Sequence, residues 1–269
     1  MLGLIPPLAD YTYAILWWGL LLVVDRYNNQ RRGLSLWNGR FRHFLLITLP
    51  TSVLLWLLFE LMNLPAPQWR YKGGLENIHV QVLFGFIAFT TVIPIMVESY
   101  WLFAGRFCLP ARFSRWFYKW RVLSILTGLV FAAIPFFNEK FWFNQGIWLT
   151  PALILLPFTT IRKCASPTIF VRALALSALL AGFCWECLNY WSRTHWEYLI
   201  LPNTVHLFQM PVPGYLGFIP FALTALVVYE QQLRIPVKFS VAILLYAASF
   251  VVLYLLTNVY VHRGLWLLN

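Results

Sequence analysis

Charged residues are scarce in this chain, and acidic residues are the scarcest of all. Of the 269 residues, 9 are Asp or Glu and 20 are Lys or Arg, so that 11% of the chain is charged. An ordinary soluble domain has roughly 25%. A chain with so little charge is not expected to cover itself with a water-facing surface, which excludes the soluble classes and indicates a protein that sits in lipid.

Motifs for nucleotide and hydrolase chemistry are missing as well. The chain contains no P-loop, no dinucleotide-binding glycine pattern, no H-E-x-x-H and no G-x-S-x-G, so nucleotide-driven or zinc-protease chemistry has no support. Cys184 and Cys187 form a single C-x-x-C inside an apolar run. A zinc site of this type needs a second pair nearby, so we interpret both cysteines as packing residues and predict no metal site.

Apolar residues dominate what remains. Hydrophobic residues make up 61% of the chain and aromatic residues 19%, and long apolar runs recur along its whole length. This pattern predicts an all-α integral membrane protein, with the lipid bilayer as its main partner. About eight transmembrane helices are expected, over residues 10–25, 44–63, 80–104, 119–137, 143–161, 169–190, 214–230 and 239–261.

The basic residues fall mostly in alternate loops between these runs. Because basic loops stay in the cytoplasm, we expect a multi-pass protein of the bacterial inner (cytoplasmic) membrane, with basic loops cytoplasmic and both termini outside. The net charge of +11 is then explained by basic loops that orient the helices in the membrane. No separate basic domain is present, so no nucleic-acid partner is predicted.

Two stretches of the chain carry the same residues in the same order, apart from two short insertions. The first contains Glu60, Asn63, Trp69, Tyr71, His79, Gly85-Phe86-Ile87, Phe89 and Glu98. The second contains Glu186, Asn189, Trp196, Tyr198, His206, Gly217-Phe218-Ile219, Phe221 and Glu230. This match predicts an internal duplication, with two parallel four-helix repeats at residues 1–137 and 138–269. A pseudo-two-fold axis along the membrane normal would relate them.

Each copy places a Glu and an Asn three residues apart at the outer end of a helix, so that the two side chains share a face. They are Glu60 with Asn63, and Glu186 with Asn189. A charged group in a span costs roughly 2.5–3.5 kcal/mol at the bilayer centre, so both glutamates need a compensating environment. Two interpretations remain open: a catalytic site with these glutamates as acids, or a structural hydrogen-bond network.

The aromatic and histidine residues of the repeat complete the predicted site. Substrate-binding roles are predicted for a set of eight residues: Asn63, Trp69, Tyr71, His79, Asn189, Trp196, Tyr198 and His206. Trp and Tyr also occur at the headgroup level of ordinary membrane proteins, so that alternative stays open. A haem held by His79 and His206 is a further alternative; otherwise no cofactor is predicted. Glu98 and Glu230 are expected to form interfacial ion pairs with nearby arginines.

Two runs carry a resemblance to known proteins. Trp185-Glu-x-x-Asn189 with Trp196-x-Tyr198, and the segment from Met210 to Phe221, resemble a family of bacterial polytopic membrane proteins of uncharacterised activity. In layout the chain is also similar to the heterodimer-type lycopene cyclases, which are small, duplicated, aromatic-rich membrane proteins with intramembrane glutamates. Their Pro-x-Glu-Glu is absent, because Phe-Ala-Leu follows Pro220, so the likeness transfers no catalytic residue.

These features favour a membrane-embedded enzyme that acts on an isoprenoid or another lipid by acid-initiated cyclisation, hydration or isomerisation. Glu60 or Glu186 would be the general acid, and the Trp and Tyr rings would stabilise a carbocation. One alternative is a non-catalytic accessory or scaffold subunit of a membrane complex that binds quinone, carotenoid or haem. Another is a small-solute transporter. The expected partner is a lipophilic ligand or a partner membrane subunit.

Overall fold

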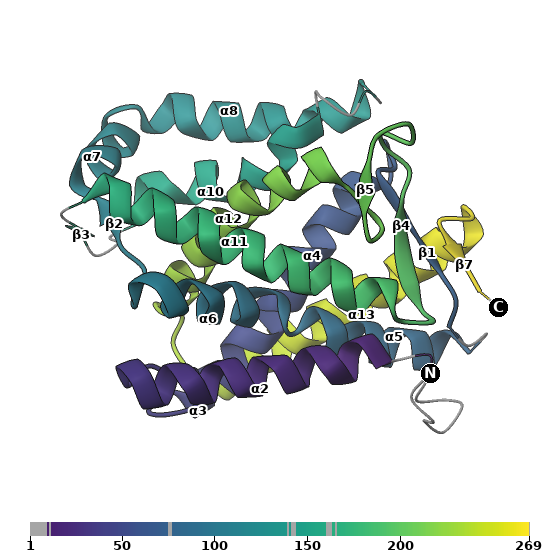
Figure 1. Cartoon of the computed structure of the whole chain (residues 1–269), viewed down its shortest axis with the longest axis horizontal. Helices are drawn as coiled ribbons and strands as arrows, with labels where there is room; N and C mark the ends of the chain where they lie inside the picture. The colour runs from purple at the N-terminus through teal and green to yellow at the C-terminus, as the bar shows by residue number, and fades with distance from the viewer. Residues whose placement is uncertain are drawn as a thin grey trace.

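A computed structural model shows a bundle of helices that run side by side along the long axis of the molecule (Figure 1). Short strands close the bundle at both ends. The structure describes residues 10, 12–74, 77–138, 140, 144–159, 163–164 (backbone only) and 166–268.

Within these residues, five helices are long and apolar enough to cross a membrane, in agreement with the prediction of a multi-pass membrane protein. They lie at Phe41–Asn63, Ile78–Ala104, Pro167–Tyr190, Val212–Gln232 and Phe239–His262. In these spans the α-helices are α3 (Phe41–His43), α4 (Leu49–Asn63), α5 (Ile78–Phe89), α6 (Val92–Ala104), α11 (Pro167–Tyr190), α12 (Phe218–Gln232) and α13 (Phe239–His262). A π-helical turn, Phe44–Thr48, joins α3 to α4, and a 3₁₀ segment, Val212–Gly217, leads into α12.

The prediction of eight spans is not supported. Helix α2 (Thr12–Arg32) covers the first predicted span, but its last two turns are polar and include Asp25 and Arg26. Helices α7 (Ala111–Lys119) and α8 (Arg121–Ala133) meet at an 83° bend and count as a sixth span only if taken together. The apolar helix Gln145–Phe158, which contains α10 (Thr150–Leu155), is shorter than the roughly 20 residues that a bilayer core requires.

The span Ile78–Ala104 is broken between α5 and α6, four residues before Pro94. Proline has no backbone N–H and crowds the carbonyl four residues back, so a helix breaks or bends at that point. Ser52 of α4 satisfies the groups freed by the break: its hydroxyl donates to the Phe89 carbonyl at 2.7 Å and accepts from the Ile93 N–H at 3.0 Å. A side chain of a neighbouring helix thereby allows a broken helix at membrane depth.

Helices from the two predicted halves pack against each other. Helix α11 lies along α6, and α13 lies along α4 and α5. Helix α13 keeps only 22% of its span buried inside the protein, so an apolar face with Leu244, Val251 and Leu255 remains exposed. An exposed face of this composition suits contact with lipid tails. The boundary between the two predicted repeats, at residues 137 and 138, stays a prediction.

A three-stranded sheet at one end of the bundle determines how the two stretches meet. Strand β1 (Trp69–Lys72) lies in its centre, antiparallel to β4 (His195–Tyr198) and parallel to β7 (Trp266–Leu267). The start of α2 lies at the same end (Figure 1); residues 1–9 and 269, and with them both termini, lie outside the described residues. Two short pairs complete the strands: β2 (Leu109–Pro110) with β3 (Lys163–Cys164), and β5 (His206–Leu207) with β6 (Met210–Pro211).

Candidate functional site

Asn63 and Asn189 attach the two sheet strands to the ends of their helices in the same way. The Asn63 amide donates to the Trp69 carbonyl at 3.0 Å and accepts from the Trp69 N–H at 3.3 Å. The Asn189 amide makes the same two bonds to Trp196, both at 2.9 Å. Both amides are fully buried and bind backbone groups of the strands. The substrate-binding role predicted for Asn63 and Asn189 stays a prediction.

Each strand also carries a tyrosine that bonds to the glutamate of the helix before that strand. Tyr71 donates a hydrogen bond to Glu60 Oε1, and Tyr198 donates to Glu186 Oε1 at 2.7 Å. Glu60 is 3% exposed and Glu186 is 0% exposed. No described Lys or Arg forms an ion pair with either glutamate. A carboxyl group in such surroundings is stable as the neutral acid, because an unpaired charge would lack both water and a cation.

The tyrosines lie in the strands, outside the spans, and both remain protonated. Burial, together with the nearby glutamate, raises the pKa of Tyr71 and of Tyr198 well above the ordinary value for tyrosine. Each hydroxyl can therefore hold and pass on a proton but does not become a free phenolate.

The strand register brings the two similar stretches together. In the β1–β4 pair, Trp69 lies opposite Tyr198, and Tyr71 lies opposite Trp196. In each of these pairs a tryptophan therefore faces a tyrosine. The predicted gathering of these residues at one end of the bundle is therefore observed for Glu60, Asn63, Trp69 and Tyr71 with their four counterparts.

The two glutamates nevertheless have different surroundings. Both oxygens of Glu60 lie within hydrogen-bond distance of described donors, because the Trp69 indole N–H approaches them at 3.3–3.4 Å. Glu60 lines a cavity of about 10 Å³, which is at the lower limit for one water molecule. Glu186 Oε2 has no hydrogen-bond partner among the described residues. Of these two glutamates, Glu186 therefore keeps a carboxyl oxygen without a hydrogen-bond partner in the described part of the chain.

A chamber walled by aromatic rings lies beside Tyr198, and we call it the aromatic chamber. Its volume is about 50 Å³. The lining consists mainly of rings from several elements: Trp56, Trp69, Trp148, Trp185, Trp196, Tyr198, Phe218 and Phe221. The Trp56 and Trp185 rings are 5.4 Å apart, and Trp69 stacks on Trp148 at 5.8 Å. The Tyr198 side chain therefore connects Glu186 to an apolar space.

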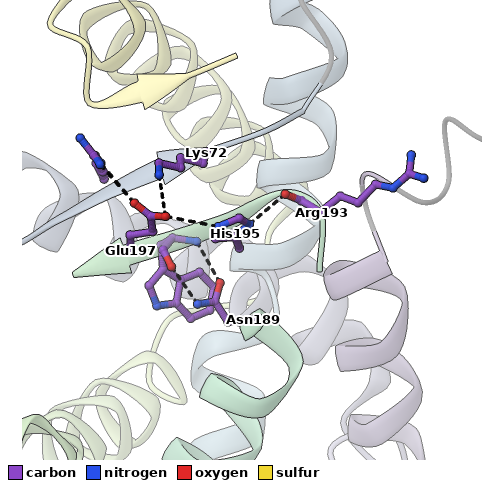
Figure 2. Close-up of polar contacts among 7 residues, drawn as sticks. Lys72, Asn189, Arg193, His195 and Glu197 are labelled. Carbon is purple, nitrogen blue, oxygen red and sulfur yellow. Dashed lines mark hydrogen bonds and ion pairs between the residues drawn. The ribbon is translucent and has the colours of Figure 1, made fainter. Parts of the chain in front are cut away.

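An ion cluster covers the outer side of the sheet. Glu197 of β4 is contacted by Lys72 at 2.7 Å, by Arg70 at 3.2 Å and by the His195 ring at 3.7 Å. Figure 2 shows Glu197 between Lys72 and His195, with Asn189 on the inner side of the strand. Burial favours a higher pKa for Glu197, but Lys72 and Arg70 outweigh it and hold that pKa below its ordinary value.

His79 and His206 are not placed alike. His79 lies in the first turn of α5, where Asn77 caps the helix, and its ring stacks on Tyr254 at 5.9 Å. His206 is exposed in β5, and its Nδ1 is 2.7 Å from the Thr204 carbonyl. Among the described residues, no group of three or more His, Cys, Asp or Glu side chains could hold a metal ion. The alternative of a haem between these two histidines stays untested.

Glu98 is buried and forms no salt bridge with a described arginine, which corrects the ion pair expected for it. It is 0% exposed and accepts a 2.6 Å hydrogen bond from Asn28 of α2. Asp25 of α2 is buried as well. Asp25 itself accepts from the Leu36 N–H at 2.7 Å and from the Ser35 hydroxyl at 2.8 Å. Asn28 and Glu98 are 70 residues apart in the chain. Sequence spacing alone therefore could not identify this contact.

The aromatic chamber was also missed by sequence reasoning. Trp56 precedes Glu60 by one helical turn, and Trp185 directly precedes Glu186; these positions are the signal that could have drawn attention to the chamber. Trp148 has no such signal, because it lies in a short helix that is distant in sequence from both Glu60 and Glu186. Comparisons with protein-family models, curated proteins and solved structures give no match, so the function is argued from this site.

Proposed function

We propose that the protein is a membrane-embedded enzyme that protonates a carbon–carbon double bond of an isoprenoid or similar branched lipid. The observation that carries this proposal is the hydrogen bond from Tyr198, which lines the aromatic chamber, to the buried carboxyl of Glu186. It links a neutral acid to an apolar space through one hydroxyl.

In the proposed reaction, Glu186 supplies the proton and the Tyr198 hydroxyl delivers it. For this transfer the hydrogen bond between the two groups reverses, so that the neutral Glu186 carboxyl donates to the Tyr198 oxygen. The hydroxyl then gives its own proton to one carbon of the double bond and takes the proton of the Glu186 carboxyl, which becomes a carboxylate. The neighbouring carbon becomes a tertiary carbocation, and the faces of Trp56, Trp185 and Trp196 would stabilise it. Loss of a proton from an adjacent carbon restores the acid and moves the double bond. Capture of water, with loss of its extra proton, gives a tertiary alcohol instead.

The size of the chamber supports some of the reactions considered from the sequence more than others. A cavity of about 150 Å³ is the size that binds benzene, whereas the aromatic chamber measures about 50 Å³. It admits the methyl-branched end of a chain and is too small for a ring. Isomerisation or hydration is therefore favoured over cyclisation. The same argument weighs against quinone, carotenoid-ring or haem binding in this chamber.

Glu60 has the structural role in this scheme. Its two oxygens are occupied by Tyr71 and Trp69, and the Tyr260 hydroxyl donates to its backbone carbonyl at 2.9 Å. We propose that the two stretches derive from a duplication related by a pseudo-two-fold axis, and that only the second copy kept its reactive acid. The paired hydrogen bonds of Asn63 and Asn189 support this origin.

We further propose that the sheet end of the bundle faces outward from the bacterial inner membrane. The opposite end carries α3 and α7 with their basic residues (Figure 1), as expected for the cytoplasmic side. Substrate would then reach the aromatic chamber from the outer half of the bilayer.

The proposal is tested by lipid analysis of cells that express the wild type or Tyr198→Phe. The phenylalanine keeps the ring and removes only the hydroxyl that delivers the proton. Wild-type cells should accumulate an isoprenoid that is one water heavier or has a shifted double bond, and Tyr198→Phe cells should lack it. Identical lipid profiles of wild-type cells and of cells without the protein would refute the proposal.

A further inference from the structure

A second cavity, at the end of the bundle opposite the sheet, has a different chemistry from the aromatic chamber. We call it the basic cavity. Its volume is about 550 Å³, within the range of about 300–1,000 Å³ that is usual for ligand pockets. Three helix ends enclose it: the turn after α2, the end of α6 and the end of α12. Its lining includes Ser35, Asn38, Arg40, Trp101, Arg106, Phe107, Tyr229 and Glu230.

Two arginines of the lining, Arg40 and Arg106, have no salt bridge within the part of the chain that the structure describes. Both are exposed to the cavity and its mouth. Their positive charges act on the Glu230 carboxylate, as does that of Arg234. One carboxylate against the two lining arginines leaves an excess of positive charge in the cavity.

Helix dipoles do not account for these two arginines. The C-terminal ends of helices favour nearby cations, but other arginines already occupy that position. Arg32 donates to the Leu102 carbonyl near the end of α6 at 2.9 Å, and Arg234 donates to the Phe158 carbonyl at 3.1 Å. Arg40 and Arg106 therefore remain available for a ligand that comes from outside.

The floor of the cavity is aromatic and rigid. Trp101, Phe107 and Tyr229 are 6%, 2% and 7% exposed. The chain turns at Gly33, Gly39 and Gly105, all with positive φ, which is a conformation that favours glycine. The turn backbones thus place Arg40 and Arg106 above a fixed apolar floor. An anion with an attached apolar part would contact both surfaces.

We propose that the basic cavity binds a phosphate group, with Arg40 and Arg106 as its ligands. A planar guanidinium can give two parallel N–H bonds to one phosphate, which is the usual reason for arginine at such sites. The phosphate can be carried by a lipid headgroup of the adjacent leaflet or come from solution. This site is separate from the aromatic chamber and does not depend on the function proposed for it.

The test uses the full-length protein, delipidated in a neutral detergent, with two probes titrated separately. Inorganic phosphate is followed by calorimetry, and phosphatidylglycerol is followed by native mass spectrometry. Arg40→Gln combined with Arg106→Gln should weaken binding by about tenfold or more, because charge-assisted bonds are lost. Arg115→Gln is the matched control, since Arg115 is an exposed arginine of α7 outside the cavity, and it should bind as the wild type does.

Glu230→Gln gives a result that misfolding cannot imitate. Removal of the competing negative charge should tighten binding by about threefold. Saturation by inorganic phosphate would identify a soluble source, and binding of phosphatidylglycerol alone would identify a headgroup; both support the site. The proposal is overturned if the wild type binds neither probe, if the double variant binds as the wild type does, or if Glu230→Gln weakens binding.

Discussion

Replacement of Asn63 by Ala tests whether the two buried asparagines hold the sheet against the helices. The substitution removes the bonds that Asn63 accepts from the Gln68 N–H at 2.7 Å and from the Trp69 N–H at 3.3 Å, and the bond that it donates to the Trp69 carbonyl at 3.0 Å. These three backbone groups lose their bonds to Asn63, at about 1–3 kcal/mol each. The Tyr260 hydroxyl loses its bond from Asn63 but keeps its own to the Glu60 carbonyl. We therefore expect a loss of about 3 kcal/mol or more in the free energy of unfolding.

Asn189→Ala should give a somewhat smaller loss, because it frees one N–H and one carbonyl, both on Trp196. Asn258→Ala is the control: Asn258 is exposed and bonds only within α13, so the change should stay within about 0.5 kcal/mol. Denaturant titration in detergent, followed by tryptophan fluorescence, measures all three variants. If Asn63→Ala were no more destabilising than Asn258→Ala, the structural role of these amides would be refuted.

Two further predictions concern the sheet. A Cβ at Gly73, where φ is +83°, would lie 2.6 Å from the Arg193 carbonyl oxygen, so Gly73→Ala should cost more stability than Gly33→Ala. At Gly33 φ is also positive, but nothing lies within 4 Å, and only the strain of about 1–2 kcal/mol remains; equal losses in thermal scans would contradict this. The pKa of Glu197 is lower in the folded protein than in the unfolded chain, where it is about 4.3. Its ion cluster therefore stabilises the fold fully at a pH above about 4.3. That contribution, roughly 0.2–1 kcal/mol for such a partly exposed site, is lost as the pH falls through the folded value. Glu197→Gln should remove this acid limb from the pH dependence of unfolding, and an unchanged limb would assign it to other groups.

Part of this molecule could be predicted from local patterns. The five long apolar helices follow from runs such as 44–63 and 239–261, because a span needs only sufficient length and few charges. The grouping of Glu60 and Asn63 with Trp69 and Tyr71 also followed from spacing. A helix end and the loop directly after it must lie at the same membrane surface.

Other features depend on contacts that no local pattern encodes. The antiparallel pairing of Trp69 with Tyr198 joins segments more than a hundred residues apart, and the bond from Asn28 to Glu98 joins α2 to α6. The count of eight spans failed at α2, because its polar last turns pack inside the protein, where Asp25 and Asn28 are buried. Apolar content along the sequence does not distinguish such a helix from one that crosses lipid.

The central claim is that Glu186, and not Glu60, supplies a proton through Tyr198 to a lipid double bond. Deuterium transfer tests it most directly: the purified protein in lipid nanodiscs is incubated in D₂O with a neutral-lipid extract of the expressing cells. Mass spectrometry should detect deuterium in an isoprenoid with the wild type and with folded Glu60→Gln, and none above background with Glu186→Gln. Equal incorporation by Glu186→Gln and the wild type would contradict the account.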